Sequence, residues 1–162
     1  MLSTTRCVLF THEHVQPDHL LNMYTNEQVR RYLGGALQQE TICLDTIKQE
    51  MSEHTWGIYT QKNFIGLISL DQHHDKTSTE ISYQFMPHAW GKRYAFEVAT
   101  AVIDYAFKSL HLPYLVAETQ TANHRSRKLL EKLNMEVTGT VQRFGESQHL
   151  YKLRNKGGKQ SE

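Results

Sequence analysis

The chain has 162 residues, of which 39% are hydrophobic and 22% are charged, so its length and composition fit one globular domain. Eighteen Lys and Arg residues oppose seventeen Asp and Glu residues, and the net charge of +1 argues against a nucleic-acid binder and a membrane-surface protein. No apolar run approaches the roughly 18 residues of a transmembrane helix, and the first apolar stretch is too short for a signal peptide. We therefore expect a cytoplasmic protein that uses neither a membrane nor a nucleic acid as partner.

Cysteine and histidine bear on possible metal chemistry. Cys7 and Cys43 can form neither a CxxC zinc site nor a disulfide framework, which indicates free thiols in a reducing compartment. Ten histidines invite a metal interpretation, but His12-Glu13-His14 lacks the i, i+4 spacing of a zinc HExxH helix. His73 and His74 fall in a polar segment that reads as a solvated loop. We expect no metal site.

The first third of the chain is predicted to be mainly helical after a short strand. Asp18 and Asn26 stand near helix starts, and Ile42, Ile47 and Met51 recur at roughly helical spacing. The predicted elements are a strand over Arg6–Phe10 and helices over Pro17–Tyr24, Glu27–Leu33 and Glu40–Glu53.

A three-strand meander and a crossover unit follow. In the third strand Ile81, Tyr83 and Phe85 share one face, and Glu80 lies on the other. The next helix has one narrow polar stripe, and the strand after it is almost continuously apolar, as in a parallel pair. Strand, helix and strand therefore predict a right-handed βαβ unit. The predicted strands are Trp56–Thr60, Phe64–Leu70, Thr79–Phe85 and Tyr114–Thr119, and the helix is Ala89–Leu110.

The last part of the chain is predicted to hold one more helix and two strands. Asn123 caps a helix that runs through Leu133, and Asn134 is suited to the left-handed residue that ends it. The final strands are Val137–Arg143 and His149–Leu153, joined through Gly145. The whole order predicts an α+β fold with a mixed sheet, one domain over residues 1–154 and a disordered polar tail over 155–162.

The segment between the meander and its following helix is the strongest candidate for ligand binding. Gly91 lies in a turn at a helix N-terminus, where free backbone N–H groups and the positive end of the helix dipole favour an anion such as phosphate. Lys92 and Arg93 add positive charge. One glycine is also compatible with a plain strand–helix turn.

Five stretches in order along the chain resemble the GNAT acyl-CoA N-acyltransferase superfamily, closest to its ribosomal-protein N-terminal acetyltransferase-like branch, the RimJ/RimL type. They are Glu80-Ile-Ser-Tyr-Gln-Phe-Met-Pro87, Trp90-Gly-Lys-Arg-Tyr-Ala95, Ala117-Glu-Thr119, Asn123-x-x-Ser126 and Leu129-Leu-Glu-Lys-Leu-Asn-Met135. The resemblance extends weakly to the front and to the terminal strands, so it covers nearly the whole chain.

The resemblance implies a mostly antiparallel sheet, flanked by helices and splayed at a central parallel pair, with acetyl-CoA as cosubstrate between the splayed strands. Unpaired backbone groups of such strands would pair with the pantetheine amides. The backbone contacts implied for pantetheine come from Gln84, Phe85 and Met86, and the pyrophosphate contacts come from the amides of Gly91, Lys92, Arg93, Tyr94 and Ala95.

Two departures from the family pattern concern backbone conformation. Arg93 stands where the family usually has a second glycine, so the loop loses freedom to take a positive φ. Its amides still serve a phosphate if Arg93 keeps φ negative. Asn134-Met135 replaces the usual Gly-Phe, a mild change because Asn tolerates the left-handed conformation.

Acetyl transfer requires a base, an oxyanion donor and a proton for the departing thiolate. Glu80 is the candidate base, or an ordinary solvent-facing strand residue. Ser126 lies on the inward helix face with Leu129 and Leu130; its hydroxyl is the candidate proton donor to the CoA sulfur, or it serves its own helix turn. Tyr151 is the competing acid. Asn123 is a candidate cofactor contact, or a helix cap only.

The acceptor that the resemblance favours is a primary amine, above all a protein N-terminus. An α-amine with a pKa of about 7.7–8.0 demands less from a base than a lysine at about 10.4. The alternative acceptors are small amines, an aminoglycoside or a polyamine, although the front half shows no strong acidic cluster for a polycation. A non-catalytic acyl-CoA-binding module is the alternative from another class. The protein is expected to be a monomer or a homodimer.

Overall fold

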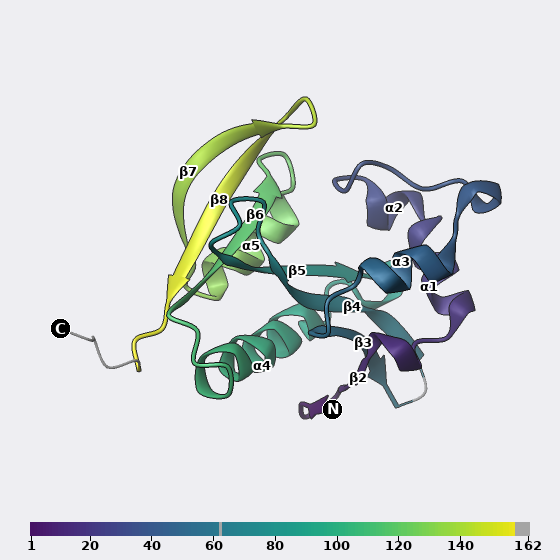
Figure 1. The fold of residues 1–162 in the computed structure, drawn as a ribbon, viewed down its shortest axis with the longest axis horizontal. Helices are drawn as coiled ribbons and strands as arrows, with labels where there is room; N and C mark the ends of the chain where they lie inside the picture. Colours follow the sequence, from purple (N-terminus) through teal and green to yellow (C-terminus); the bar gives the residue numbers. More distant parts are fainter. Residues whose placement is uncertain (62, 158–162) are drawn as a thin grey trace. The chain divides into compact units, whose positions relative to one another are not determined.

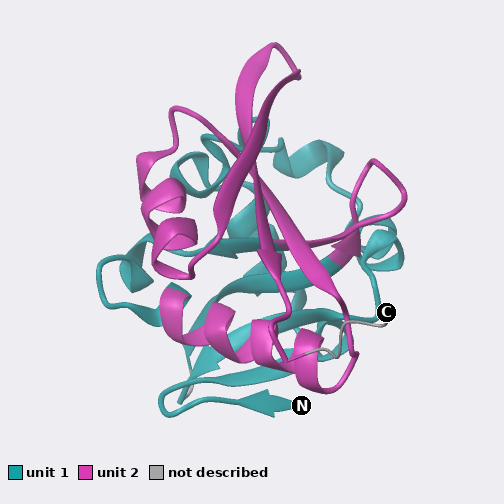
Figure 2. Cartoon of the chain, turned by 90° about the vertical axis from the view of Figure 1, so that its left-hand side faces the viewer, with its two compact units in different colours: residues 1–70, 82–95 teal, residues 71–81, 96–162 magenta. Residues whose placement is uncertain are grey.

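The computed structural model describes residues 1–61 and 63–157 (Figure 1). These residues form two compact units (Figure 2). Unit 1 comprises Met1–Leu70 and Ser82–Ala95, and unit 2 comprises Asp71–Ile81 and the chain from Phe96 onward. Most of the predicted tail over 155–162 lies outside the described residues. Asn155, its first residue, donates a backbone hydrogen bond to the Pro113 carbonyl at 2.9 Å.

The strands form one eight-stranded mixed sheet in the order β1-β2-β3-β4-β5-β6-β8-β7. β5 and β6 are parallel and pair at Glu80 and Val116, whereas β1–β2–β3–β4 and β6–β8–β7 pair antiparallel. The bounds are β1 Leu2–Ser3, β2 Val8–Thr11, β3 Thr55–Thr60, β4 Asn63–Gln72, β5 Thr79–Phe85, β6 Tyr114–Gln120, β7 Glu136–Arg143 and β8 Glu146–Arg154. With helices beside this sheet, the predicted α+β class and the βαβ unit β5–α4–β6 are confirmed.

The helices confirm the predicted order but differ in their bounds. They are α1 Pro17–Tyr24, α2 Glu27–Arg30, α3 Leu44–Glu50, α4 Tyr94–Lys108 and α5 His124–Lys132, with 3₁₀ turns η1 His12–His14, η2 Gln39–Thr41 and η3 Pro87–Ala89. α2 stops before Leu33 because the chain turns into Gly34 and Gly35, both with positive φ. The backbone is extended at Cys43 and Met51, so the helix predicted over Glu40–Glu53 is limited to α3.

The core of unit 1 joins the first helices to a strand. Apolar side chains of α1 and α2 pack against buried residues of β4, and Met86 at the end of β5 contacts the same cluster. The buried members are Val15, Leu20, Met23, Val29, Phe64 and Leu67. This packing explains why short helices with little intrinsic stability form here.

Unit 2 is organised by polar caps and turns that the sequence indicates. Asn123 accepts a hydrogen bond from the Ser126 N–H at 3.2 Å, which satisfies one free donor at the start of α5. Asn134 ends the helix with φ 64°. Phe144 and Gly145, at φ 53° and 76°, form the two-residue connection of the β7–β8 hairpin, which the twist of paired strands favours.

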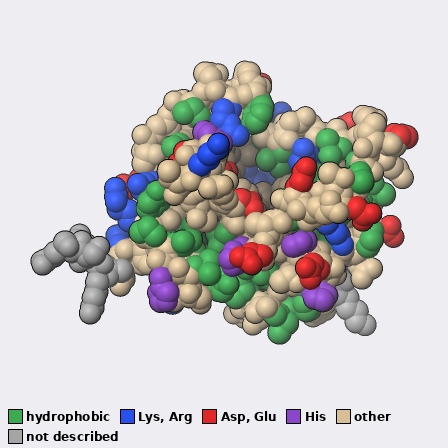
Figure 3. All heavy atoms as spheres, viewed as in Figure 1, with side chains coloured by type: hydrophobic (Ala, Val, Ile, Leu, Met, Phe, Trp, Pro, Cys, Tyr) green, Lys and Arg blue, Asp and Glu red, His purple; other side chains and the backbone are tan. Residues whose placement is uncertain are grey.

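The surface agrees with the near-neutral composition. On the face drawn in Figure 3, acidic, basic and histidine side chains are interspersed among apolar ones. Among the described helices, none combines the length and the apolar composition that crossing a membrane requires.

Candidate active site

The loop between β5 and α4 concentrates backbone donors. After the η3 turn the chain passes through Gly91 at φ 75° and Arg93 at φ 64°, and α4 begins at Tyr94. The helix therefore starts five residues later than predicted, because this loop occupies its expected first turn. Left-handed residues in such a loop turn successive N–H groups toward one concavity, and the first N–H groups of α4 have no intrahelical acceptor.

Arg93 corrects one sequence expectation. Arg93 was expected to keep a negative φ if the amides of this loop are to hold a phosphate, yet it adopts the left-handed conformation at φ 64°. A non-glycine residue there costs about 1–2 kcal/mol, because its Cβ approaches the neighbouring carbonyl oxygen. The loop therefore keeps its shape at a cost in stability.

We predict that Arg93→Gly raises the free energy of unfolding by about 1 kcal/mol. This net value is the relief of the left-handed strain minus the free-energy cost of the greater flexibility that glycine gives the unfolded chain. Arg93→Ala is the matched control, since it removes the same guanidinium but keeps the strained Cβ. Urea unfolding of the three proteins measures the effect. Equal stabilities of the Gly and Ala variants would contradict a strained Arg93.

Two residues that sequence reasoning missed hold this loop in unit 1. The Trp90 indole N–H donates to the Phe85 carbonyl at 2.8 Å, which ties the loop to the end of β5. Arg6 donates from Nη1 to the Lys92 carbonyl at 3.0 Å, and its guanidinium lies 4.2 Å from the centre of the Tyr94 ring. Trp90 lies inside a recognised motif, but Arg6 lies 86 residues from Lys92, so no local pattern identifies it.

The end of β5 presents a buried polar atom. Gln84 Oε1 is buried and has no hydrogen-bond partner within the described residues. Beside it, the Met86 N–H donates to the Ile65 carbonyl at 2.8 Å, which anchors the strand end to β4. A buried acceptor without a donor is destabilising, so a ligand N–H that donates to Gln84 Oε1 would be stabilised there.

A pocket of about 260 Å³ adjoins the end of β5 in unit 1. It is lined by His19 and Asn22 of α1, Asn63 and Phe64 of β4, and Met86 and His88 beyond β5. The lining offers amide, imidazole and apolar groups, and none of these six residues is a carboxylate.

The other predicted site residues lie in unit 2. Glu80 is half-buried on β5, and its Oε2 lies 3.7 Å from His73 Nε2. Ser126 is half-buried in the first turn of α5, where its backbone N–H is held by the Asn123 cap. Asn123 therefore acts as a helix cap, which is one of the two roles expected from the sequence; its other expected role, a cofactor contact, remains a prediction.

Tyr151 lies in the interior of unit 2. Its side chain is fully buried on β8, and its hydroxyl has no hydrogen-bond partner in the described part of the chain. Because the whole Tyr151 side chain is 0% exposed, whereas Gln84 is half-buried, we propose that the Tyr151 hydroxyl stays within the core and that Ser126 is the acid.

We therefore predict that Tyr151→Phe leaves kcat within about threefold of the wild type and raises stability by about 1 kcal/mol, because an unpaired buried hydroxyl is destabilising. Thermal unfolding and steady-state rates on the same preparation measure both quantities. Tyr105→Phe, on the half-buried side of α4, controls for removing a hydroxyl as such. A loss of kcat without a loss of stability would restore Tyr151 as the acid.

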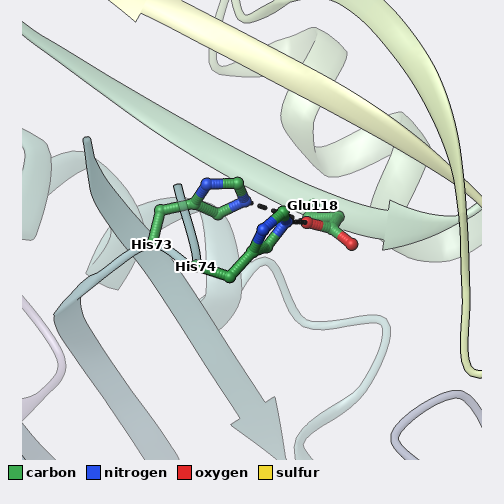
Figure 4. A group of neighbouring side chains, drawn as sticks. All are labelled: His73, His74 and Glu118. Atoms are coloured by element: carbon green, nitrogen blue, oxygen red, sulfur yellow. Dashed lines mark hydrogen bonds and ion pairs between the residues drawn. The ribbon is translucent and has the colours of Figure 1, made fainter. Parts of the chain in front are cut away.

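His73 is a second correction. It was expected in a solvated loop, but it is 3% exposed, and its Nε2 lies 2.9 Å from Glu118 Oε2 (Figure 4). The turn is ordered by Asp75, which accepts hydrogen bonds from the Ser78 hydroxyl and from the N–H groups of Thr77 and Ser78. These bonds, that of the Ser78 side chain above all, hold the pKa of the Asp75 carboxyl well below its usual range.

Comparison with known proteins decides the family. The model of the acetyltransferase (GNAT) domain matches residues 8–136, most of the chain. This chain belongs to the GNAT acetyltransferase family. It is thus an N-acetyltransferase, and the residues that the family model matches include the loop before α4.

Individual relatives agree with this assignment. The chain is 28% identical to the uncharacterized N-acetyltransferase YoaA of Bacillus subtilis over 89% of this chain and 87% of that protein. The spermidine N-acetyltransferase of Vibrio cholerae, solved with CoA and spermine, has a TM-score of 0.77 at 19% identity over 93% and 96% of the two chains. A Salmonella typhimurium enzyme that modifies the N-terminal serine of ribosomal protein L7/L12 has a TM-score of 0.76 at 14% identity over 93% and 96%. The two solved structures share the GNAT fold with this chain.

Proposed function

We propose that this GNAT enzyme transfers the acetyl group of acetyl-CoA to the N-terminal amine of a protein, as enzymes of the RimJ/RimL type do. The observation that carries the proposal is the segment from Gly91 to Ala95, which leads into the N-terminus of α4. Two of its residues, Gly91 and Arg93, are left-handed. A diphosphate fits such a loop because backbone N–H groups and the helix dipole both favour an anion.

The residues of unit 1 suit the rest of acetyl-CoA. The pantetheine arm carries two amide N–H groups, and Gln84 Oε1 is a buried acceptor in need of a donor. Gln84, Phe85 and Met86 would hold that arm, and Gly91, Lys92, Arg93, Tyr94 and Ala95 would hold the pyrophosphate. The Trp90 and Arg6 contacts keep the strand end and the loop in their mutual positions.

The transfer itself needs few groups. The neutral amine attacks the thioester carbonyl carbon, a C–N bond forms, the C–S bond breaks, and the thiolate takes up a proton. We assign Glu80 to accept the proton that the ammonium or the tetrahedral adduct loses, and Ser126 to donate to the sulfur. A backbone N–H of β5 is the proposed donor to the oxyanion.

The acceptor is proposed from acid–base chemistry and from the pocket. An α-amine is partly neutral near pH 7.5, whereas a lysine or a polyamine is almost fully charged. The pocket beside Met86 lies in unit 1, and its six lining residues carry no carboxylate that would attract a polycation. Both features favour a protein N-terminus over spermidine.

The test is calorimetric titration with acetyl-CoA followed by thiol release against an acceptor panel. The panel holds short peptides with free Ser or Ala N-termini, the same peptides N-acetylated but with an internal lysine, spermidine, and an aminoglycoside. We expect micromolar binding of acetyl-CoA and turnover on the free N-termini alone. Turnover on spermidine or the aminoglycoside would overturn the acceptor assignment. Binding without any turnover would instead indicate a non-catalytic acyl-CoA module.

A further inference from the structure

We propose that His73, His74 and Glu118 form a binding site for a divalent transition-metal ion, with Zn²⁺ as the first choice. Nothing in the proposed acetyl transfer requires this site, and it reverses the expectation from sequence that the chain has no metal site. His73 Nε2 and His74 Nε2 lie 2.9 Å and 3.2 Å from the same oxygen, Oε2 of Glu118 (Figure 4).

The donor spacing suits a bound ion. The three ligand atoms lie within 4.8 Å of one another. Zn²⁺ binds imidazole nitrogen and carboxylate oxygen at about 2.0–2.2 Å, so neighbouring ligand atoms of a tetrahedral site lie about 3.3–3.6 Å apart. The two nitrogen–oxygen distances, 2.9 Å and 3.2 Å, are slightly shorter than this, so a small outward shift of the ligands would admit the ion.

His73 is prepared for ligation by its surroundings. It is buried, and its second ring nitrogen, Nδ1, lies 3.4 Å from the Asp75 carboxylate. Histidines that bind a metal usually donate their other N–H to a carboxylate, which sets the tautomer and the ring orientation. Nδ1 accepts the Asp75 backbone N–H at 3.4 Å, and Nε2 is hydrogen-bonded to Glu118 at 2.9 Å. Binding of an ion at Nε2 would shift the ring proton to Nδ1, which lies beside the Asp75 carboxylate.

The balance of charge also favours a cation. Three carboxylates, those of Asp75, Glu80 and Glu118, surround the imidazole of His73. Arg143 contacts this group, with Nη1 2.9 Å from Glu118 Oε2. A carboxylate has two oxygens and several lone pairs, so Glu118 can serve Arg143 and a metal ion together. Glu80 Oε2, 3.7 Å from His73 Nε2, adds negative charge near the site but is not one of the three proposed ligands.

The ligand set selects the class of ion. Two imidazoles and a carboxylate suit Zn²⁺, Cu²⁺, Ni²⁺ and Co²⁺, whereas Mg²⁺ and Ca²⁺ require mostly oxygen ligands. We therefore expect Zn²⁺ to bind and Mg²⁺ not to bind at comparable concentrations.

The experiment is calorimetric titration of the tag-free, chelator-treated protein with Zn²⁺ alone, supported by the visible absorption of Co²⁺. We expect one ion per chain, and we expect His74→Ala, whose side chain is 49% exposed, to weaken Zn²⁺ binding at least tenfold without unfolding the protein. His14→Ala removes an exposed histidine of the His12–His14 segment and should leave the affinity unchanged. Asp75→Asn should weaken binding about tenfold through the orientation of His73.

Arg143→Ala gives a change of the opposite sign. It removes the neighbouring positive charge and should tighten Zn²⁺ binding several-fold. Absence of saturable Zn²⁺ binding by the wild type, an equal affinity in His74→Ala, or a preference for Mg²⁺ would each overturn the site. A Co²⁺ spectrum that persists in His74→Ala would do the same.

Discussion

Gly66→Ala is expected to lower the free energy of unfolding by about 2 kcal/mol and the melting temperature by roughly 4–8 °C. A Cβ at position 66 would overlap the Gln84 carbonyl oxygen and lie 3.0 Å from the Phe85 Cα. Both obstacles are backbone atoms, which cannot rotate away as a side chain can. β4 and the end of β5 must therefore separate.

The same variant should raise the KM for acetyl-CoA, because the displaced residues include Gln84 and Phe85 of the proposed pantetheine strand. Gly139→Ala is the matched control: Gly139 also lies in a strand, but a Cβ there meets nothing within 4 Å. Thermal unfolding and initial rates of both variants provide the comparison. A Gly66→Ala protein as stable as Gly139→Ala would refute the close approach of β4 to β5.

Ser126→Ala is expected to lower kcat about 100-fold and to change the KM for acetyl-CoA by less than about twofold, which is typical of losing a positioned proton donor. The helix start should survive, because the bond to the Asn123 side chain comes from the backbone N–H of residue 126. A loss of activity would then reflect the hydroxyl and not the fold.

Ser126→Thr retains a hydroxyl and should recover part of the rate, whereas Ser109→Ala, at the exposed end of α4, should have no effect. Steady-state kinetics with the best acceptor peptide and a melting curve for each variant complete the test. Unchanged kcat in Ser126→Ala would remove Ser126 from the mechanism and leave its N-terminal position in α5 as its only role.

Much of the fold follows from local patterns. α1 and β5 have the predicted bounds, because Pro17 starts a helix and residues 79–85 alternate between two faces. The caps at Asn26, Asn123 and Asn134 behave as expected, since each depends on bonds within a few residues. The predicted boundaries fail where the backbone leaves the helical conformation: α3 is flanked by extended Cys43 and Met51, and α4 begins late because Gly91 and Arg93 before it are left-handed.

The candidate site also has parts that the sequence predicts and parts that it does not. Gly91 and the residues around it are recognisable because their motif is contiguous. The Arg6 contact with Lys92 and the His73 contact with Glu118 join residues 86 and 45 positions apart, so no window of sequence contains both partners. His73 and His74, adjacent in a polar stretch, look solvated until Glu118 is brought beside them.

By itself the sequence determined the α+β class, the order of the elements, the capped helices and the turn that precedes α4. These features rest on periodicity and on hydrogen bonds between near neighbours, which the order of residues specifies directly. The tertiary structure decided the left-handed Arg93, the full burial of Tyr151, the Arg6 contact that steadies the loop, and the grouping of His73, His74 and Glu118. Each of these depends on packing between segments distant along the chain, where the free energy of many contacts outweighs the preference of any one residue.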